Sequence, residues 1–458
     1  MVPATDEIQA FVWPPQAPAA SPQLGLAGSK DFYAYLNLYT PNFEYTPKEL
    51  ADLRRANPSA FKNVLNRLAE RQVKFIRGQD MSPETISGHH IPATRTRVYP
   101  DGGGNRTWRL GDIAYSTPIG VGRPVENYNL LYGDKTYEHF LVRYKNRRQM
   151  IYVGANDGML HAFNGGFFNS TDSSFNLQRS TETPFALGQE VWAYIPYNLL
   201  PHLHWLTEPT YRDQIHVSYM DLPPRVFDAR VFFMSDGVTP LDNSTYPDGW
   251  GTILVAGMRF GGGAIQVDMD KTDGKNFDAT SDRITSSAYV IMDITNPEAP
   301  PRLLGEIAMP RQGFTTCFPT VIPMATANAR TDQQNQWYLI FGSGPADANG
   351  NANPELIQKA VSNQNGQLYV LDLKALASKK QVQTLQSNGQ FKAGGHTFAT
   401  TESGSFISDP ATVDLDIGSN RNASARFKAD VVYYGTIAGD MTQPRGTMYR
   451  VADRKSVV

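Results

Sequence analysis

The acidic run at 268–278 contains the residue types that a calcium ion requires. Asp268, Asp270, Asp273 and Asp278 occur in the spacing D-x-D-x-x-D-G-x-x-x-D. Ca²⁺ binds roughly six to eight oxygens, and carboxylates at alternating positions of a tight loop direct several of them inward. The spacing departs from an EF-hand loop, because the third aspartate is displaced by one position and no terminal glutamate follows. We favour a hairpin insertion here and keep calcium binding as the alternative.

Histidine residues suggest a second kind of metal chemistry. If PHLHWL were a strand, it would direct the imidazoles of His202 and His204 to one face, and His216 follows shortly after. A zinc site needs about four ligands, and no cysteine or clear third ligand accompanies these residues. We therefore predict loop or surface histidines. The same prediction covers three further residues: His89, His90 and His161.

Covalent catalysis finds little support in the sequence. No G-x-S-x-G motif occurs, and the glycine-rich run that begins at Gly342 lacks the Lys-Ser/Thr of a phosphate loop. Cys317 is the only cysteine, so no intramolecular disulfide can form, and its setting GFTTCFPTV suits a small core residue. A glycosidase stays open, because paired carboxylates from distant segments are invisible in a sequence. We predict that the chain is not an enzyme.

A recurring phrase defines the architecture that must position any such site. The run YVGANDGMLHAFN at 152–164 predicts a β-hairpin, since Asn, Asp and Gly suit a tight turn between apolar strands. The same plan of apolar strand, glycine-rich turn and second strand returns at 250–268, 336–374 and 430–453. Repeated sheet units at such spacing are typical of a β-propeller. We predict an all-β fold, an irregular propeller with long insertions.

The beginning of the chain has a different character. The run at 46–78 shows apolar residues at helical spacing, which predicts two helices packed on the side of the propeller. We divide the chain into an N-terminal lead with a short helical segment, 1–105, and a propeller, 106–458. No leader peptide and no long apolar run is visible. The last strand lacks a closing partner, so we expect a fragment, truncated at its C-terminal end, whose open edge pairs with a strand of another protein.

Length and charge limit the classes of partner. The chain has 458 residues, of which 41% are hydrophobic, enough for a large core. Its formal net charge is −2, with no basic stripe. This charge argues against nucleic acid and against an anionic membrane as bulk electrostatic partners. We predict a protein that is not membrane-spanning and binds no nucleic acid.

An ordered series of phrases resembles one known family. The phrases are WRLGDIAYSTPI, GANDGMLHAFN, EVWAYIPYNLLPHL, WGTILVAGMRFGGG, YVIMDITNPEAPPRLLGEI, VDLD and VVYYGTIAGDM with GTMYR. From about Phe75 to the end, they resemble the C-terminal propeller of the PilC/PilY family of type IV pilus tip-associated biogenesis and adhesion proteins. The resemblance implies seven irregular blades. It also implies a secreted, non-enzymatic protein at the pilus tip (fimbrium) or outer membrane, which is exported through the periplasm.

The resemblance further implies a function and partners. Such a protein supports pilus assembly by antagonising retraction, and it acts as an adhesin in cell adhesion and twitching motility. Its partners would be minor pilins at the pilus tip and a host or abiotic surface. The alternative is a periplasmic quinoprotein-like or other propeller enzyme, although the adjacent cysteine pair of quinoprotein dehydrogenases is missing.

The family also implies a calcium loop, with the pattern D-x-D-x-[DN]-x-x-x-D. The matching positions are Asp414, Asp416 and Asp430, and Asn420 or, alternatively, Asn422 is a further oxygen donor. Gly418 replaces the third acidic ligand, and an insertion lengthens the loop before Asp430. Fewer carboxylates and a longer loop weaken both charge and rigidity. Calcium regulation through this loop is one interpretation, and a solvated turn is the other.

Overall fold

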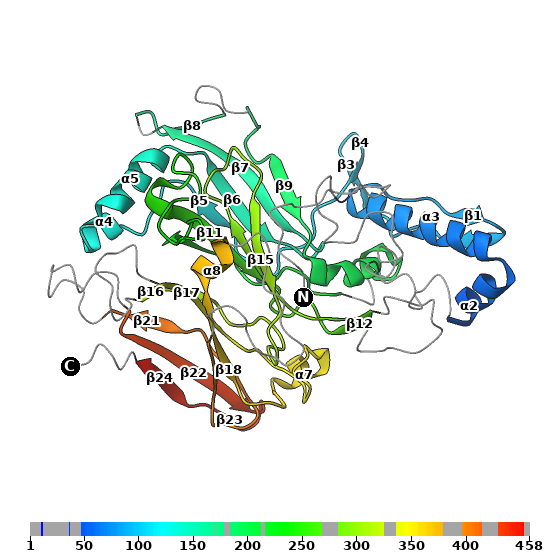
Figure 1. Ribbon diagram of the computed structural model, residues 1–458. Helices are drawn as coiled ribbons and strands as arrows, with labels where there is room; N and C mark the ends of the chain where they lie inside the picture. The colour runs from blue at the N-terminus through cyan, green and yellow to red at the C-terminus, as the bar shows by residue number, and fades with distance from the viewer. Residues whose placement is uncertain are drawn as a thin grey trace.

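The computed structural model describes residues 11, 36, 47–169, 171–177, 184–211, 216–267, 283–324, 336–378, 396–414 and 429–452. Within these ranges, four antiparallel sheets of four or five strands follow one another along the chain, with few helices (Figure 1). The prediction of a mostly β fold is therefore confirmed. Strand pairing in the described ranges closes no sheet on itself, so seven blades remain a prediction.

Each of the four sheets is built from one stretch of the chain. The first contains β5 (Ile119–Val121), β6 (Gln149–Gly154), β7 (Leu160–Asn169), β8 (Ser174–Asn176) and β9 (Glu190–Tyr194). The second contains β10 (Arg225–Arg230), β11 (Trp250–Gly257), β14 (Tyr289–Asp293) and β15 (Arg302–Ile307). The third contains β16 (Thr320–Met324), β17 (Gln336–Gly342), β18 (Gln367–Asp372) and β19 (His396–Ala399). The fourth contains β20 (Ser405–Ile407), β21 (Ala411–Val413), β22 (Val431–Gly439), β23 (Pro444–Arg445) and β24 (Met448–Ala452).

Shorter elements connect or flank these sheets. Three separate hairpins are β1 (Glu84–Ile86) with β2 (His89–Ile91), β3 (Val98–Asp101) with β4 (Gly104–Thr107), and β12 (Ile265–Val267) with β13 (Arg283–Thr285). The α-helices are α2 (Pro47–Ala56), α3 (Pro58–Ile76), α4 (Tyr128–Leu131), α5 (Lys135–Tyr144), α7 (Pro354–Lys359) and α8 (Leu373–Ser378). Two 3₁₀ segments are η2 (Tyr197–Thr207) and η3 (Pro247–Gly249).

The burial of each strand follows its sequence pattern. All residues of β11 and β14 are buried, as continuous apolar runs require when both faces of a sheet are covered. In β22, by contrast, buried residues alternate with exposed Tyr433 and half-exposed Gly435, which leaves one face of the fourth sheet toward solvent.

The predicted hairpin at 152–164 is confirmed as β6 and β7. Its turn closes through a hydrogen bond from the backbone N–H of Ala155 to the carbonyl of Met159, at 3.0 Å. Only Gly158 adopts a positive φ, of 93°. A positive φ therefore does not explain why Asn156 and Asp157 occupy the turn. Their side chains form hydrogen bonds in the site described below, and these bonds explain the two residues.

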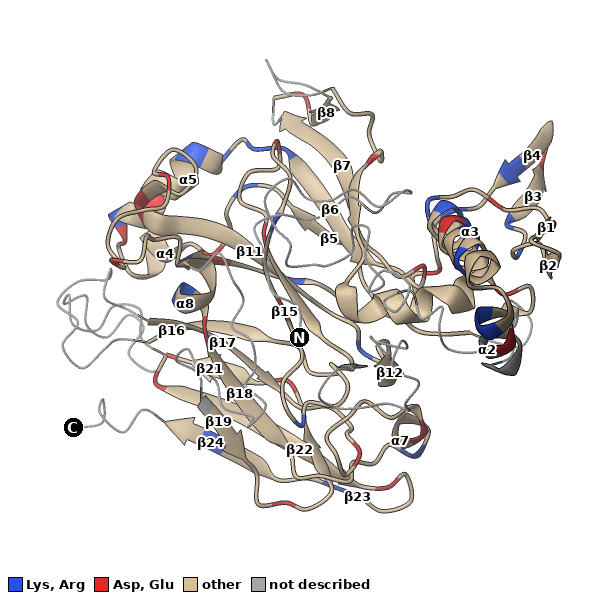
Figure 2. Cartoon of the chain, turned by 45° about the vertical axis from the view of Figure 1, so that its right-hand side comes forward, with Lys and Arg blue, Asp and Glu red and all other residues tan. Residues whose placement is uncertain are grey.

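The two predicted N-terminal helices are also confirmed, as α2 and α3. Asn57 caps α3, since its side chain accepts a hydrogen bond from the N–H of Ala60 at 3.0 Å. Figure 2 shows charges of both signs along α3, and Glu84 of β1 pairs there with Arg67 at 2.9 Å and Arg71 at 2.6 Å. These ion pairs hold the β1–β2 hairpin against the helix.

An aromatic cluster joins the second and third sheets to α4. Trp250 at the start of β11 and Trp337 in β17 lie with their ring centroids 5.5 Å apart. Tyr128 of α4 contacts both indoles, at 5.5 and 6.1 Å, and Tyr137 of α5 packs edge-on against Trp250 at 4.9 Å. Both indoles are buried, so this cluster is where two consecutive sheets share one core.

Removing Trp337 should therefore loosen the contact between the two sheets. We expect Trp337→Ala to lower the free energy of unfolding by about 3–5 kcal/mol, because it deletes a buried aromatic side chain and leaves a cavity. The control is Trp108→Ala, whose indole is 61% exposed and whose loss should change stability by less than about 0.5 kcal/mol. Urea unfolding measures both, and equal effects of the two variants would contradict the shared core.

Candidate functional site

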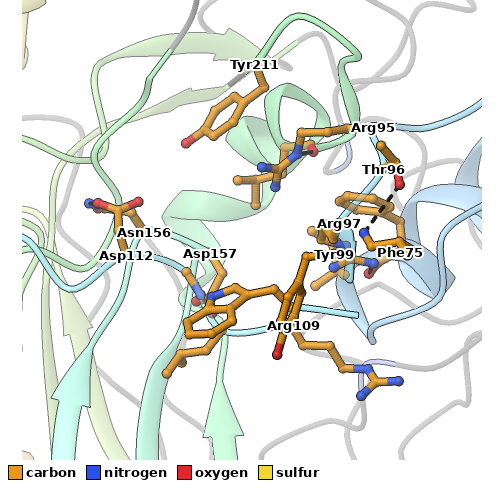
Figure 3. Close-up of a pocket in the computed structure, with 16 residues that line it drawn as sticks. Phe75, Arg95, Thr96, Arg97, Tyr99, Arg109, Asp112, Asn156, Asp157 and Tyr211 are labelled. Carbon is orange, nitrogen blue, oxygen red and sulfur yellow. Dashed lines mark hydrogen bonds between the residues drawn. The ribbon is translucent and has the colours of Figure 1, made fainter. Parts of the chain in front are cut away.

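A pocket of about 410 Å³ lies where the N-terminal helical segment meets the first sheet. Figure 3 shows side chains from distant parts of the sequence around it. The lining residues come from the end of α3, the 95–99 segment that enters β3, the 108–112 segment, the β6–β7 turn, the end of η2 and the residue Tyr211. The pocket is the candidate functional site, because it combines charged and aromatic groups in one concave surface.

The β6–β7 turn forms one wall of the pocket. The Asn156 side chain donates to the Asp112 carboxylate at 2.7 Å and accepts from the backbone N–H of Tyr219 at 2.9 Å. The Asp157 carboxylate accepts from the N–H of Gly111 at 2.7 Å. Two turn side chains thus tie three chain segments together.

Gly111 is required by the close approach of the 108–112 segment to this turn. A Cβ atom at that position would overlap the backbone nitrogen of Asp157. Only glycine allows the N–H of residue 111 to reach the carboxylate, which explains this residue in the phrase WRLGDIAY. The turn and the phrase were recognisable in the sequence, but their contact was not.

His161 lies behind the turn and is 2% exposed. Its Nδ1 lies 2.6 Å from the Glu190 carboxylate, and its Nε2 lies 3.1 Å from that of Asp157. Burial by itself lowers the pKa of the imidazole, but the hydrogen bonds to both carboxylates outweigh burial and raise the pKa of His161 to about 9. The prediction of a loop or surface histidine was wrong for His161, because alternation along one strand did not reveal two acidic partners.

The opposite wall consists of guanidinium and aromatic groups. The Arg97 guanidinium lies 3.7 Å from the centre of the Phe75 ring and pairs with Asp80 at 2.8 Å. The Arg95 guanidinium lies 4.9 Å from the centre of the Tyr211 ring. Such cation–π contacts fix the direction of each positive charge.

Two exposed aromatic residues stand at the mouth of the pocket. Tyr99 and Trp108 pack edge to face, with ring centroids 5.9 Å apart. They are 36% and 61% exposed. The lining combines aromatic rings, guanidinium groups and carboxylates, which are groups that can hold a ligand non-covalently.

The structure places part of the predicted calcium loop. Asp414 directly follows β21 and Asp430 directly precedes β22, and the backbone N–H of Asp430 donates to the carbonyl of Val413 at 3.0 Å. The Tyr132 hydroxyl donates to Asp414 at 2.8 Å, and both carboxylates contribute to the raised pKa of that hydroxyl after burial, the main cause. Antiparallel pairing thus brings two predicted ligands to one sheet end. Asp416 and Asn420 lie outside the described residues.

The second predicted calcium loop is the acidic run at 268–278. Asp268, Asp270, Asp273 and Asp278 all lie outside the described residues. Within the described ranges, no group of three or more His, Cys, Asp or Glu side chains is arranged to hold a metal ion. Both calcium hypotheses therefore stay predictions.

The remaining histidines and the cysteine occupy varied environments. His202 and His204 belong to η2 and are buried, so the prediction of loop or surface positions was wrong for them. Burial lowers their pKa values to about 3 and about 4. His216 is exposed and lies 3.1 Å from Asp112. Cys317 is buried, as predicted for a core residue, and burial raises the pKa of its thiol.

Comparison with known proteins shows which family this chain is similar to. Residues 110–286 match the family model of the PilY1 beta-propeller domain. The type IV pilus biogenesis factor PilY1 of Pseudomonas aeruginosa strain PAK is 27% identical over 270 residues, which cover 56% of this chain and 17% of that protein. PilY1 of strain UCBPP-PA14 is 30% identical over 202 residues, covering 43% of this chain and 14% of that protein.

One solved structure also aligns with this chain. It is the Pseudomonas aeruginosa PilY1 C-terminal domain, with a TM-score of 0.36, 20% identity, and coverage of 72% of this chain and 44% of that chain. Together, the family model and the curated relatives confirm the resemblance to the PilC/PilY family, with residues 110–286 similar to its propeller domain. The matched region spans only about a sixth of the length of the two PilY1 relatives from strains PAK and PAO1.

The pH dependence of stability should report the buried His161. A folded-state pKa of about 9 exceeds the value of about 6.5 for an unfolded chain. The resulting stabilisation is fully present below pH 6.5 and is lost as the pH rises through 9. We expect the stability difference between the wild type and His161→Gln to shrink by roughly 3 kcal/mol from pH 6 to pH 10.

Urea unfolding at pH 6, 8 and 10 measures this difference. The control is His90→Gln, since His90 is exposed on β2, and its stability difference from the wild type should stay constant over the same range. A difference for His161→Gln that does not change with pH would contradict the raised pKa.

Proposed function

We propose that this chain acts in type IV pilus biogenesis as a binding domain without enzymatic activity. The observation that carries this proposal is the match of residues 110–286 to the PilY1 beta-propeller domain, together with relatives that are named type IV pilus biogenesis factors. The pocket supports a binding role, since it presents aromatic and charged side chains but no nucleophile paired with a base.

The finer parts of the proposal concern place and partners. The protein would act at the pilus tip, outside the cell or at the outer membrane, where it binds minor pilins. It would oppose pilus retraction and contribute to adhesion to host or abiotic surfaces and to twitching motility. None of the described helices is both long and apolar enough to cross a bilayer.

Deletion of the gene in the source organism tests the pilus role. We expect the deletion to remove surface pilin from the sheared fraction, and the wild-type gene supplied in trans to restore it. If the protein opposes retraction, additional loss of the retraction ATPase should restore pili in the deletion strain. Normal piliation of the deletion strain would contradict the proposal. Turnover of an artificial electron acceptor by the purified protein would favour the propeller-enzyme alternative.

We further propose that calcium binds beside Asp414 and regulates this domain. Asp414 and Asp430 supply two carboxylates at one sheet end, and hard oxygen ligands of this kind suit Ca²⁺. Asp416 and Asn420 would complete the donor set. A bound ion would hold together the chain between β21 and β22.

Heat and urea unfolding with and without calcium test this proposal. At a calcium concentration about 100 times the dissociation constant, the free energy of unfolding should rise by roughly 2.7 kcal/mol. This gain should be lost in the double variant Asp414→Ala/Asp416→Ala. The matched control is Asp268→Ala/Asp270→Ala, which should keep the gain. Loss of the gain in the control alone would assign the ion to the second loop, and the absence of any gain in the wild type would exclude both sites.

A further inference from the structure

Arg95 occupies a fixed position in the wall of the pocket. Its backbone N–H donates to the carbonyl of Thr207 at 2.9 Å, and its side-chain Nε donates to the carbonyl of Leu206 at 3.1 Å. The end of η2 therefore holds both the backbone and the base of the guanidinium. The two terminal nitrogens form no hydrogen bond to any described residue, although a guanidinium carries five N–H donors.

Aromatic rings set the direction of this guanidinium. Its central carbon lies 4.9 Å from the centre of the Tyr211 ring and 5.9 Å from that of the Phe75 ring. Figure 3 shows Arg95 reaching toward the middle of the pocket between these two residues. The terminal nitrogens thus point into the pocket.

The charge of Arg95 lacks the partner that neighbouring arginines have. Arg97 pairs with Asp80 at 2.8 Å, and Arg71 pairs with Glu84 at 2.6 Å. No carboxylate of the described residues forms an ion pair with Arg95, and burial lowers the pKa of its guanidinium. Asp80, which forms its ion pair with Arg97, attracts the Arg95 charge only from a greater distance. A half-buried cation that no carboxylate contacts directly is costly unless a ligand supplies a counter-ion.

The acidic residues of the pocket are already engaged elsewhere. Asp157 accepts from Gly111 and from His161, while Asp112 accepts from Asn156 and lies beside His216. Their positions are therefore fixed on the turn side of the pocket. The two terminal nitrogens of Arg95 are therefore the hydrogen-bond donors that a ligand entering from solvent would meet.

We propose that this pocket binds a peptide carboxylate, with Arg95 as the anchor. The two terminal nitrogens match the two oxygens of a carboxylate in a bidentate pair. An aromatic or aliphatic side chain next to that carboxylate would pack on Tyr99 and Trp108 at the mouth. The volume of about 410 Å³ accommodates such a unit, since small-ligand pockets measure roughly 300–1,000 Å³.

Saturation-transfer NMR titrations with three small probes test this proposal. N-acetylphenylalanine carries a terminal carboxylate beside an aromatic ring, and N-acetylphenylalanine amide lacks the charge. N-acetylaspartylphenylalanine amide carries the carboxylate on a side chain. We expect at least one acidic probe to bind about tenfold or more tightly than the neutral amide. The acidic probe that binds more tightly identifies a chain terminus or an acidic side chain as the source of the carboxylate.

Variants of two lining arginines supply the matched comparison. Arg95→Gln should weaken binding of the acidic probe about tenfold or more, and Arg95→Lys, which keeps the charge but loses the fork, should weaken it less. The control is Arg109→Gln: Arg109 also lines the pocket and donates through Nε to a carbonyl, that of Gly78, at 3.2 Å. Figure 3 shows its guanidinium directed away from the centre, so binding should change less than twofold.

Several outcomes would overturn the proposal. The first is that neither acidic probe binds detectably to the wild type. The second is that the neutral amide binds as tightly as the acidic probes. The third is that Arg95→Gln and Arg109→Gln weaken binding of the acidic probe equally. Melting temperatures of the variants establish that each is folded, and Arg95→Lys gives a second test if Arg95→Gln is unstable. The titrations use purified protein and do not depend on the pilus role, so either proposal can fail while the other stands.

Discussion

The site depends on the side chains of a single turn. Asn156 and Asp157 connect the β6–β7 hairpin to the 108–112 segment and to the backbone of Tyr219. Both residues are nearly buried, and a buried polar group that loses its partner costs about 1–3 kcal/mol. Each of the two side chains makes more than one hydrogen bond, so the three segments are held in a single arrangement. These hydrogen bonds position the turn side of the pocket.

The opposite wall depends on how α3 is docked. The early part of α3 packs in its own small core with residues such as Val64 and Leu68, whereas Phe75 and Ile76 at its end belong to the main core. One helix therefore spans two cores, and its last turn carries the ring over which Arg95 and Arg97 lie. Ion pairs of Arg67 and Arg71 with Glu84 reinforce the small core. The buried end of α3 thus helps to set the position of the guanidinium groups, together with the hydrogen bonds from Arg95 to the end of η2.

The sequence predicted local structure well and the site poorly, for physical reasons. Apolar spacing and turn residues identify α3 and the β6–β7 hairpin, because both depend on neighbours within a few positions. The burial of His161 depends on Glu190, a residue of another strand, and the pocket joins Arg95 to Tyr211 and Asp157. No pattern of neighbouring residues in the sequence predicts these contacts between distant segments. The Asn-Asp pair identified the turn from the sequence, but its side-chain role emerged only from the structure, in which Gly158 alone among the turn residues has a positive φ.

A pocket between two cores has a thermodynamic consequence. A ligand that contacts both Tyr211 and the last turn of α3 binds only when the helix is docked on η2. Its binding free energy is therefore added to the stability of the docked arrangement, by the general linkage between binding and conformation. The coupling is reciprocal, so any change that loosens the docking, such as loss of the bonds from Arg95 to the end of η2, weakens ligand binding as well. The last turn of α3 is thus part of the pocket lining and not merely a support for the first sheet.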